Sequence, residues 1–233
     1  MSGPEQTVSV VIPAYQEAQS IGRIVRECLE HTPGLLEVIV VDDGSSDGTH
    51  DRAEAAGARV LRLTPNQGKG IALMRGVREA RGDAVVVLDG DGQDLPSDIP
   101  KLLHAMDPGV DCVIGSRFLG EFSPGAITRI NRLGTRALTE TMNVLFRTRL
   151  TDPVAGFRAF RRSALEGLQI QAVRYEVEFD MLLSLLRRGA NVVEVPVQRL
   201  PRSSGQSKLS AVVDGSRMLA TILRHRVAGF VAK

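Results

Sequence analysis

A short apolar run that ends at two aspartates limits the folds open to this chain. Residues 84–88, AVVVL, are strand formers and are too few to cross a membrane. Such a run without polar alternation predicts a strand buried on both faces of a parallel sheet. Asp89 and Asp91 follow it directly, separated by Gly90. Ligands of open α/β sheets bind beyond the carboxyl ends of the strands, so the two carboxylates are candidates for holding a divalent cation with a diphosphate. A solvated turn before the next helix is the alternative interpretation.

The same alternation of short apolar runs and helix-like stretches covers the first 115 residues. It predicts a mostly parallel sheet with helices on both faces, joined by right-handed crossovers. No G-x-G-x-x-G follows the first run and no P-loop motif occurs, which argues against a dinucleotide-dependent dehydrogenase and a P-loop protein. The expected strands are 8–13, 38–42, 59–63, 84–88 and 110–115, and the expected helices are 19–31, 46–56, 68–80 and 97–106.

The second part of the chain is less regular. Gly, Ser and Pro in residues 119–126 predict a loop, and the apolar spacing over 127–146 predicts an amphipathic helix. We expect next a turn and short strand over 152–160, a helix over 173–188, a strand over 192–197, a basic loop over 200–207 and a last amphipathic helix from Lys208 onward.

Length and composition favour one globular domain in a reducing compartment. The chain has 233 residues, of which 43% are hydrophobic and 24% charged. Trp is absent and aromatic residues are few, so nothing suggests a nucleic-acid partner. Cys28 and Cys112 lie far apart in apolar segments, as expected for buried thiols. Without a signal-peptide pattern or a run long enough to span a bilayer, we expect a cytoplasmic protein.

The net charge of +2 conceals two halves of opposite sign. Residues 1–114 contain 10 Lys and Arg against 18 Asp and Glu, whereas residues 115–233 contain 19 against 9. An acidic half beside a basic half suggests a cation site facing an anionic partner. Attraction between two parts of one domain would explain the same division.

Two further motifs follow expected strands. Residues 42–49, DDGSSDGT, place Asp43 where an acid can accept hydrogen bonds from a nucleoside, although the same residues also suit a capped turn. Residues 66–70, NQGKG, open a helix, and Lys69 could neutralise a phosphate or lie on the surface.

Taken together, these segments identify a family resemblance. PAYQE (13–17), DDGSSDGT, NQGKG, DGDGQDLP (89–96) and VIGSRF (113–118) resemble the family 2 glycosyltransferases in order and spacing, over about residues 7–210. The resemblance implies a GT-A fold, which is α/β and Rossmann-like, together with C-terminal amphipathic helices. It also implies a nucleoside diphosphate sugar donor, a Mg²⁺ or Mn²⁺ ion and inversion at the anomeric carbon. TDPVAGFRAFRR (151–162), YEVEF (175–179), EVPV (194–197) and RSSGQSKLS (202–210) are similar to the polyprenyl-phosphate branch, typified by dolichyl-phosphate mannosyltransferase.

The resemblance assigns roles to individual residues. Within a single domain, it implies a nucleotide-sugar half (1–118), an acceptor half (119–207) and a C-terminal helix (208–233). The implied nucleotide-sugar residues are Pro13, Ala14, Tyr15, Glu17, Asp43, Lys69, Asp89 and Gly90, and the implied metal site is Asp89, Asp91 and Gln93. The implied acceptor-phosphate residues are Arg117, Arg129, Arg132, Arg202, Ser207 and Lys208. The implied catalytic set is Asp89, Asp91, Gln93, Arg117, Asp152 and Arg202.

The expected reaction moves a hexose from a GDP-mannose or UDP-glucose type of donor to a polyprenyl or dolichyl phosphate. A lipid phosphate is already anionic and needs no general base, whereas a hydroxyl acceptor would need one, for which Asp152, Glu176 and Glu178 are candidates. A soluble or polysaccharide acceptor and a non-catalytic sugar-nucleotide-binding module are the alternatives.

Membrane association is a further expectation. Many proteins of this branch continue into transmembrane helices, whereas this sequence ends at Lys233. Arg217, Arg224 and Arg226 accompany an apolar stripe in the last helix, which suits the surface of an anionic membrane or packing against the domain. We expect a peripheral protein at the inner face of the membrane, alone or with a separate membrane subunit.

Overall fold

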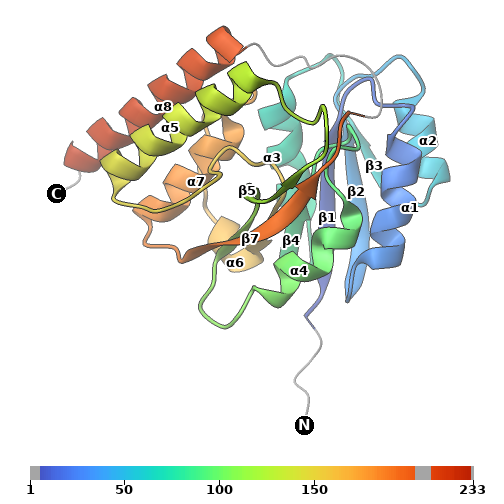
Figure 1. The fold of residues 1–233 in the computed structure, drawn as a ribbon. Coiled ribbons are helices and arrows are strands. Elements are labelled where there is room, and N and C mark those ends of the chain that lie inside the picture. Colours follow the sequence, from blue (N-terminus) through green and yellow to red (C-terminus); the bar gives the residue numbers. More distant parts are fainter. Residues whose placement is uncertain (1–5, 203–210, 232–233) are drawn as a thin grey trace.

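The computed structural model describes residues 6–202 and 211–231 and contains a seven-stranded sheet (Figure 1). The strand order is β3-β2-β1-β4-β6-β5-β7. β6 pairs antiparallel with both β4 and β5, and every other pairing is parallel. The predicted α/β class with a mostly parallel sheet is confirmed. The strands are β1 (Val8–Ala14), β2 (Leu35–Asp42), β3 (Arg59–Arg62), β4 (Ala84–Val87), β5 (Cys112–Phe122), β6 (Arg158–Arg161) and β7 (Val192–Arg199).

Helices cover both faces of the sheet (Figure 1). α1, α2 and α4 pack on one face and α3 and α7 on the other, where α5 and α8 add a further layer. None of the helices formed by the described residues combines the length and apolar character of a membrane-spanning segment. The helices are α1 (Ile21–His31), α2 (Thr49–Ala55), α3 (Lys69–Glu79), α4 (Ile99–His104), α5 (Arg129–Phe146), α6 (Arg162–Leu165), α7 (Val177–Arg187) and α8 (Ala211–Val231), and a 3₁₀ turn, Pro96–Asp98, precedes α4.

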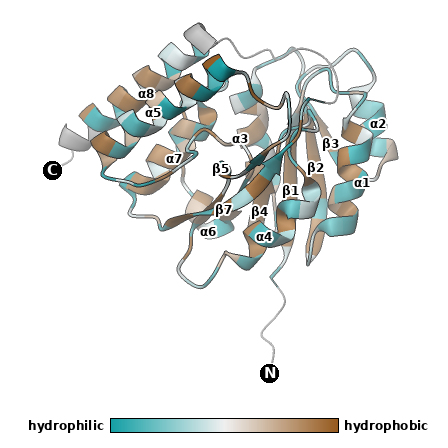
Figure 2. Ribbon diagram, viewed as in Figure 1, coloured by the Kyte–Doolittle hydropathy of each residue, from teal (hydrophilic) through white to brown (hydrophobic). Residues whose placement is uncertain are grey.

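The central strands are apolar on both faces because each face is buried in a separate core. In β1, Val10 and Ile12 belong to the core shared with α1 and α4, whereas Val11 belongs to the core shared with α3. In β4, Val86 packs with the first group and Val85 with the second, because successive side chains of a strand point to opposite faces. The residues of β4 are all hydrophobic, whereas α1 alternates between hydrophilic and hydrophobic positions (Figure 2).

The prediction of a loop over residues 119–126 is wrong for residues 119–122. β5 continues to Phe122, where Glu121 and Phe122 pair with the end of β7 after an irregularity in register. A Cβ added to Gly120 would lie 2.0 Å from the Val197 carbonyl oxygen, so glycine allows the two backbones to approach here. Residues 119–122 therefore form the irregular end of β5, whereas residues 123–126 lie outside any strand.

Two other predictions shift in detail. The helix predicted to begin at residue 173 begins at Val177, and the preceding segment crosses the opening of α3, where the Gly70 amide donates to the Val173 carbonyl (2.8 Å). In α8, Leu223 is half exposed while Ile222 is fully buried, so the predicted apolar stripe is divided between the domain and the surface.

Arg224 does not lie freely on the surface of α8, as the prediction of a basic membrane face assumed. Its guanidinium donates to Gln171 Oε1 (2.7 Å) and Asp180 Oδ1 (2.8 Å), which ties α8 to α7.

Candidate active site

A cavity of about 410 Å³ opens where β1, β2 and β4 end at the same edge of the sheet. Its wall comes from the loops after these strands, the start of α3, the segment before α7 and the end of β7. Of the residues implied by the family resemblance, those that line it are Pro13, Ala14, Tyr15, Glu17, Asp43, Lys69, Asp89, Gly90, Asp91, Gln93, Arg117 and Arg202.

Asp43 holds the loop that leads into α3. Its carboxylate oxygens accept hydrogen bonds from the backbone amides of Gln67 (2.7 Å) and Gly68 (2.8 Å), and its carbonyl accepts one from the Asn66 side chain (2.8 Å). Gly68 has a φ of +101°, and a Cβ there would lie 2.6 Å from the Val173 carbonyl oxygen. The DDGSSDGT and NQGKG segments therefore form one connected wall of the cavity.

Lys69, the first residue of α3, bridges two carboxylates inside the cavity. Its Nζ lies 2.8 Å from Asp89 Oδ1 and 2.5 Å from Glu178 Oε1. Burial alone would lower the pKa of Lys69, but the charges of Asp89 and Glu178 outweigh it and raise the pKa above its ordinary value. Burial would likewise raise the pKa of Asp89, yet Lys69 and Arg199 bring it below its usual range. Lys69 and Asp89 are therefore both charged at neutral pH.

Asp91 has more acidic surroundings than Asp89. Burial first, and then the neighbouring charge of Asp89, raise the pKa of Asp91. Arg202 Nη2 lies 3.5 Å from Asp91 and 2.7 Å from Glu17 Oε1, so its guanidinium spans the loops that follow β1 and β4. Asp89 thus pairs with Lys69 and Asp91 lies near Arg202, two cations from other parts of the chain.

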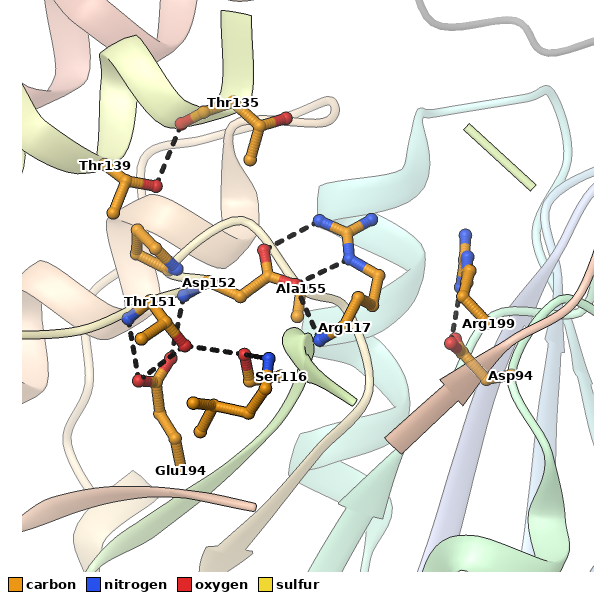
Figure 3. Close-up of polar contacts among 12 residues, drawn as sticks. Asp94, Ser116, Arg117, Thr135, Thr139, Thr151, Asp152, Ala155, Glu194 and Arg199 are labelled. Carbon is orange, nitrogen blue, oxygen red and sulfur yellow. Dashed lines mark hydrogen bonds and ion pairs between the residues drawn. The ribbon is translucent and has the colours of Figure 1, made fainter. Parts of the chain in front are cut away.

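Arg199, at the end of β7, joins the loop after β4. It forms an ion pair with Asp94 (Figure 3), and its Nη2 donates to Gln93 Oε1 (3.0 Å). The Gln93 amide nitrogen donates in turn to the Leu200 carbonyl (3.0 Å). Burial would lower the pKa of Arg199, but the surrounding carboxylates, Asp94 foremost, raise it above its ordinary value.

Arg117 is held side-on by a buried carboxylate (Figure 3). Its Nε and Nη2 donate to Asp152 Oδ2 (2.6 Å) and Oδ1 (2.8 Å), and its backbone amide donates to Oδ2 (3.0 Å). Asp152 is fully buried, whereas the Arg117 side chain is 15% exposed and lines the cavity. Two parallel contacts of this kind fix the plane of a guanidinium more firmly than one.

Comparison with known proteins shows which family has this arrangement of motifs at the strand ends. The model of the family described as "Glycosyl transferase family 2" matches residues 9–168. The chain belongs to this family. It is therefore a glycosyltransferase, and the alternative of a non-catalytic binding module is set aside.

Relatives and solved structures agree with the family and the fold. The chain is 34% identical to a dolichol-phosphate mannosyltransferase of Pyrococcus furiosus, covering 94% of this chain and 62% of the relative. It is 34% identical to a polyprenol monophosphomannose synthase of Mycolicibacterium smegmatis, covering 89% and 82%. Glucosyl-3-phosphoglycerate synthase from Mycobacterium tuberculosis, in complex with Mn²⁺, UDP-glucose and phosphoglyceric acid, superposes with a TM-score of 0.75 at 28% identity over 95% of this chain and 80% of that one. The seven-stranded fold is thus GT-A-like.

Several residues expected at the glycosyltransferase site lie outside the cavity. Asp152 lies behind Arg117 and does not line it. Arg129 and Arg132 are exposed at the start of α5, and the Arg132 guanidinium stacks over the Phe122 ring at 5.6 Å. Their role in binding acceptor phosphate stays a prediction. Ser207 and Lys208 lie outside the described residues.

Other lining residues carried no role in the sequence reasoning. Arg199 and Arg174 contribute cations, Tyr175 places its ring under Lys69 (5.7 Å), and a Cβ on Gly156 would lie 3.4 Å from an Asp89 oxygen. The YEVEF and AGFR segments signalled Tyr175 and Gly156 by resemblance alone. Nothing in the pattern around Arg199 distinguished it from other arginines in the basic half.

The donor set at the acidic pair fits a magnesium or manganese ion. Within residues 6–202 and 211–231, no group of three or more His, Cys, Asp or Glu side chains could hold a metal by itself. Asp89 and Asp91 supply two carboxylates, which suffices for an ion that keeps waters and takes its other ligands from substrate phosphates. Gln93 directs its amide oxygen to Arg199 instead, so its predicted role as a third ligand requires that contact to be exchanged.

Proposed function

We propose that this glycosyltransferase moves a hexose from a GDP-mannose or UDP-glucose type of donor to a polyprenyl phosphate, with inversion and with Mg²⁺ or Mn²⁺. One observation carries the proposal: one lysine and four arginines line the cavity beside its acids, while the acids that could act as a general base are either paired with a cation or lie outside the cavity. An acceptor that is already ionised needs positive charge in the cavity to bind it, and it does not need a general base.

Two of the three base candidates are held by cations, and the third does not line the cavity. Asp152 gives both oxygens to Arg117 and is fully buried, and Glu178 lies 2.5 Å from the Lys69 ammonium. Glu176 accepts long contacts from backbone amides before α7 (3.4 and 3.5 Å) and does not line the cavity. A carboxylate bound to a cation is a weak acceptor for the proton of a sugar hydroxyl. These contacts favour a phosphate acceptor.

The cations of the cavity are placed to gather anions. Arg117 and Arg202 line the same cavity as Asp89 and Asp91, and Arg174 and Arg199 add charge to this lining. Charge-assisted contacts of this kind stabilise both the attacking phosphate and the departing diphosphate. We assign Arg117 and Arg202 to this task, with Ser207 and Lys208 as predicted partners.

The donor would bind on the acidic side. Pro13, Ala14, Tyr15 and Glu17 with Asp43 surround the space for the nucleoside, and Asp89 and Asp91 would hold the metal ion. When bound, the ion would neutralise the charge that develops on the leaving diphosphate. Lys69 holds Asp89 at a fixed place and in its ionised form.

Two kinds of acceptor remain to be separated by experiment. The names of the Pyrococcus and Mycolicibacterium relatives favour a polyprenyl phosphate, whereas the solved synthase was crystallised with phosphoglyceric acid, a soluble phosphate. Labelled GDP-mannose or UDP-glucose with Mn²⁺ should be offered a short polyprenyl phosphate and 3-phosphoglycerate in parallel. We expect label in the organic phase. Label that stays in water, and only with 3-phosphoglycerate, would replace the lipid acceptor with a soluble one.

We further propose that the paired helices α5 and α8 (Figure 1) contact an anionic membrane surface, alone or beside a separate membrane subunit. Both helices expose apolar side chains, among them Ile130 (75%), Leu133 (72%) and Val227 (65%), and α5 adds exposed arginines. Sedimentation with vesicles containing anionic lipid should fall when Ile130 and Leu133 are both replaced by Ser. Equal binding by that double variant would refute this surface.

A further inference from the structure

Glu194 of β7 binds the turn that carries Asp152 (Figure 3). Its Oε1 accepts a hydrogen bond from the Asp152 amide (2.8 Å), and its Oε2 accepts from the Thr151 amide (2.7 Å) and hydroxyl (3.0 Å). No cation within the described part of the chain forms an ion pair with Glu194. Its charge is satisfied by the turn itself, which is a strong reason for that turn to keep one conformation.

The direction of the hydrogen bonds can be worked out from this set. The one hydroxyl proton of Thr151 goes to Glu194, so the 2.6 Å contact between Ser116 and Thr151 must have Ser116 as donor. The Ser116 oxygen then accepts from the Leu119 amide (3.2 Å). Hydrogen bonds to the Glu194 carboxylate and to Thr151 thus connect β7, the turn at Thr151 and Asp152, and β5.

Asp152 connects this hydrogen-bond network to the cavity. Its position is set by Glu194 through its amide, and its carboxylate grips Arg117 along the Nε and Nη2 edge. The remaining Nη1 edge of Arg117 has no hydrogen bond to the described residues and is the edge available to an anion in the cavity. The network therefore runs from Glu194 through Asp152 to Arg117.

We propose that Glu194 is a positioning residue for transfer, which acts through Asp152 to aim Arg117 at the acceptor phosphate or the leaving diphosphate. The inference rests on the proposed function, because it needs an anion beside Arg117. Glu194 does not line the cavity, so any effect of its removal on turnover must be indirect.

Glu194→Gln is the sharpest variant because it keeps the shape of the side chain. All the neighbours of the carboxylate are donors, so the new amide group must face an N–H wherever it points. Misplacing a catalytic group by about 1 Å can cost about 100-fold. We expect kcat/KM for short polyprenyl phosphate to fall about 10- to 100-fold, with nucleotide affinity by calorimetry unchanged. Glu194→Asp, which keeps the charge, should recover part of the loss, and Glu140→Gln on the exposed face of α5 should match the wild type.

A double-variant test separates positioning from general damage. On an Arg117→Ala background, Glu194→Gln should cause no further loss, because its effect passes through the missing guanidinium. An equal loss on both backgrounds would overturn the proposal, as would wild-type turnover by Glu194→Gln.

A second readout needs no substrate. The Nε–H signal of Arg117 in ¹⁵N spectra should be sharp in the wild type and broadened by fast exchange in Glu194→Gln. An unchanged signal would also overturn the proposal. If the wild type makes no lipid product, the proposed acceptor fails, whereas the spectra still decide the role of Glu194.

Discussion

Replacing Lys69 with Met tests the electrostatic core of the site. The change removes the ammonium that lies 2.8 Å from Asp89 and 2.5 Å from Glu178, and leaves the two carboxylates, 22% and 7% exposed, without the cation between them. Loss of one partner from a buried ion pair costs about 3–5 kcal/mol, because the other charge stays buried. Lys101→Met is a matched control, since Lys101 pairs with Asp98 at 2.6 Å but its side chain is 57% exposed. Its loss should be below about 1 kcal/mol.

The pH dependence of that loss follows from the lowered pKa of Asp89. A folded-state pKa below the unfolded value gives stability that is present above about pH 3.9 and is lost as pH falls further. Urea unfolding should therefore show the full difference between the wild type and Lys69→Met at pH 7, and a smaller one below pH 4. Adding Glu178→Gln to Lys69→Met should restore part of the stability. A loss no larger than that of Lys101→Met at pH 7 would refute this reasoning.

Further variants and conditions test other parts of the fold. Gly120→Ala should lower the free energy of unfolding by about 1–3 kcal/mol, because its Cβ would meet the backbone of β7, whereas Gly134→Ala on α5 meets open space and should cost nothing. Burial raises the pKa of Cys28 to about 12, so native protein at pH 8 should leave this thiol unlabelled by iodoacetamide until urea is added. Burial would raise the pKa of Asp180, but the hydrogen bonds from His225 and two backbone amides lower it to about 2, so its stabilisation should be full above about pH 3.9 and disappear toward pH 2. Asp180→Asn should flatten that acid transition in thermal unfolding.

The sequence predicted what depends on local pattern. Continuous apolar runs such as 84–88 indicated strands buried on two faces, and the core on each side of β4 confirms it. Because parallel strands end at one edge, the residues after β1, β2 and β4 were expected together, and Glu17, Asp43 and Asp89 line one cavity. These predictions needed no knowledge of side-chain partners.

What the sequence could not predict depends on contacts between distant segments. Arg199 meets Gln93 and Asp94 because β7 ends beside the loop after β4, and nothing near Arg199 signals that pairing. The β5 extension was hidden because Gly120, which usually marks a loop, here allows close approach to β7. Asp152 was expected to touch substrate, and its burial behind Arg117 follows from tertiary packing alone.

We propose that the acceptor brings its own negative charge to the arginines of the cavity. The most direct test offers the enzyme, with labelled donor and Mn²⁺, a short polyprenyl phosphate and the matching polyprenol without phosphate, in separate reactions. We predict an organic-extractable product from the phosphate and none from the alcohol, and a large but still measurable loss of that product in Arg117→Ala. Transfer to the alcohol that depends on Glu178 as a base would contradict the account.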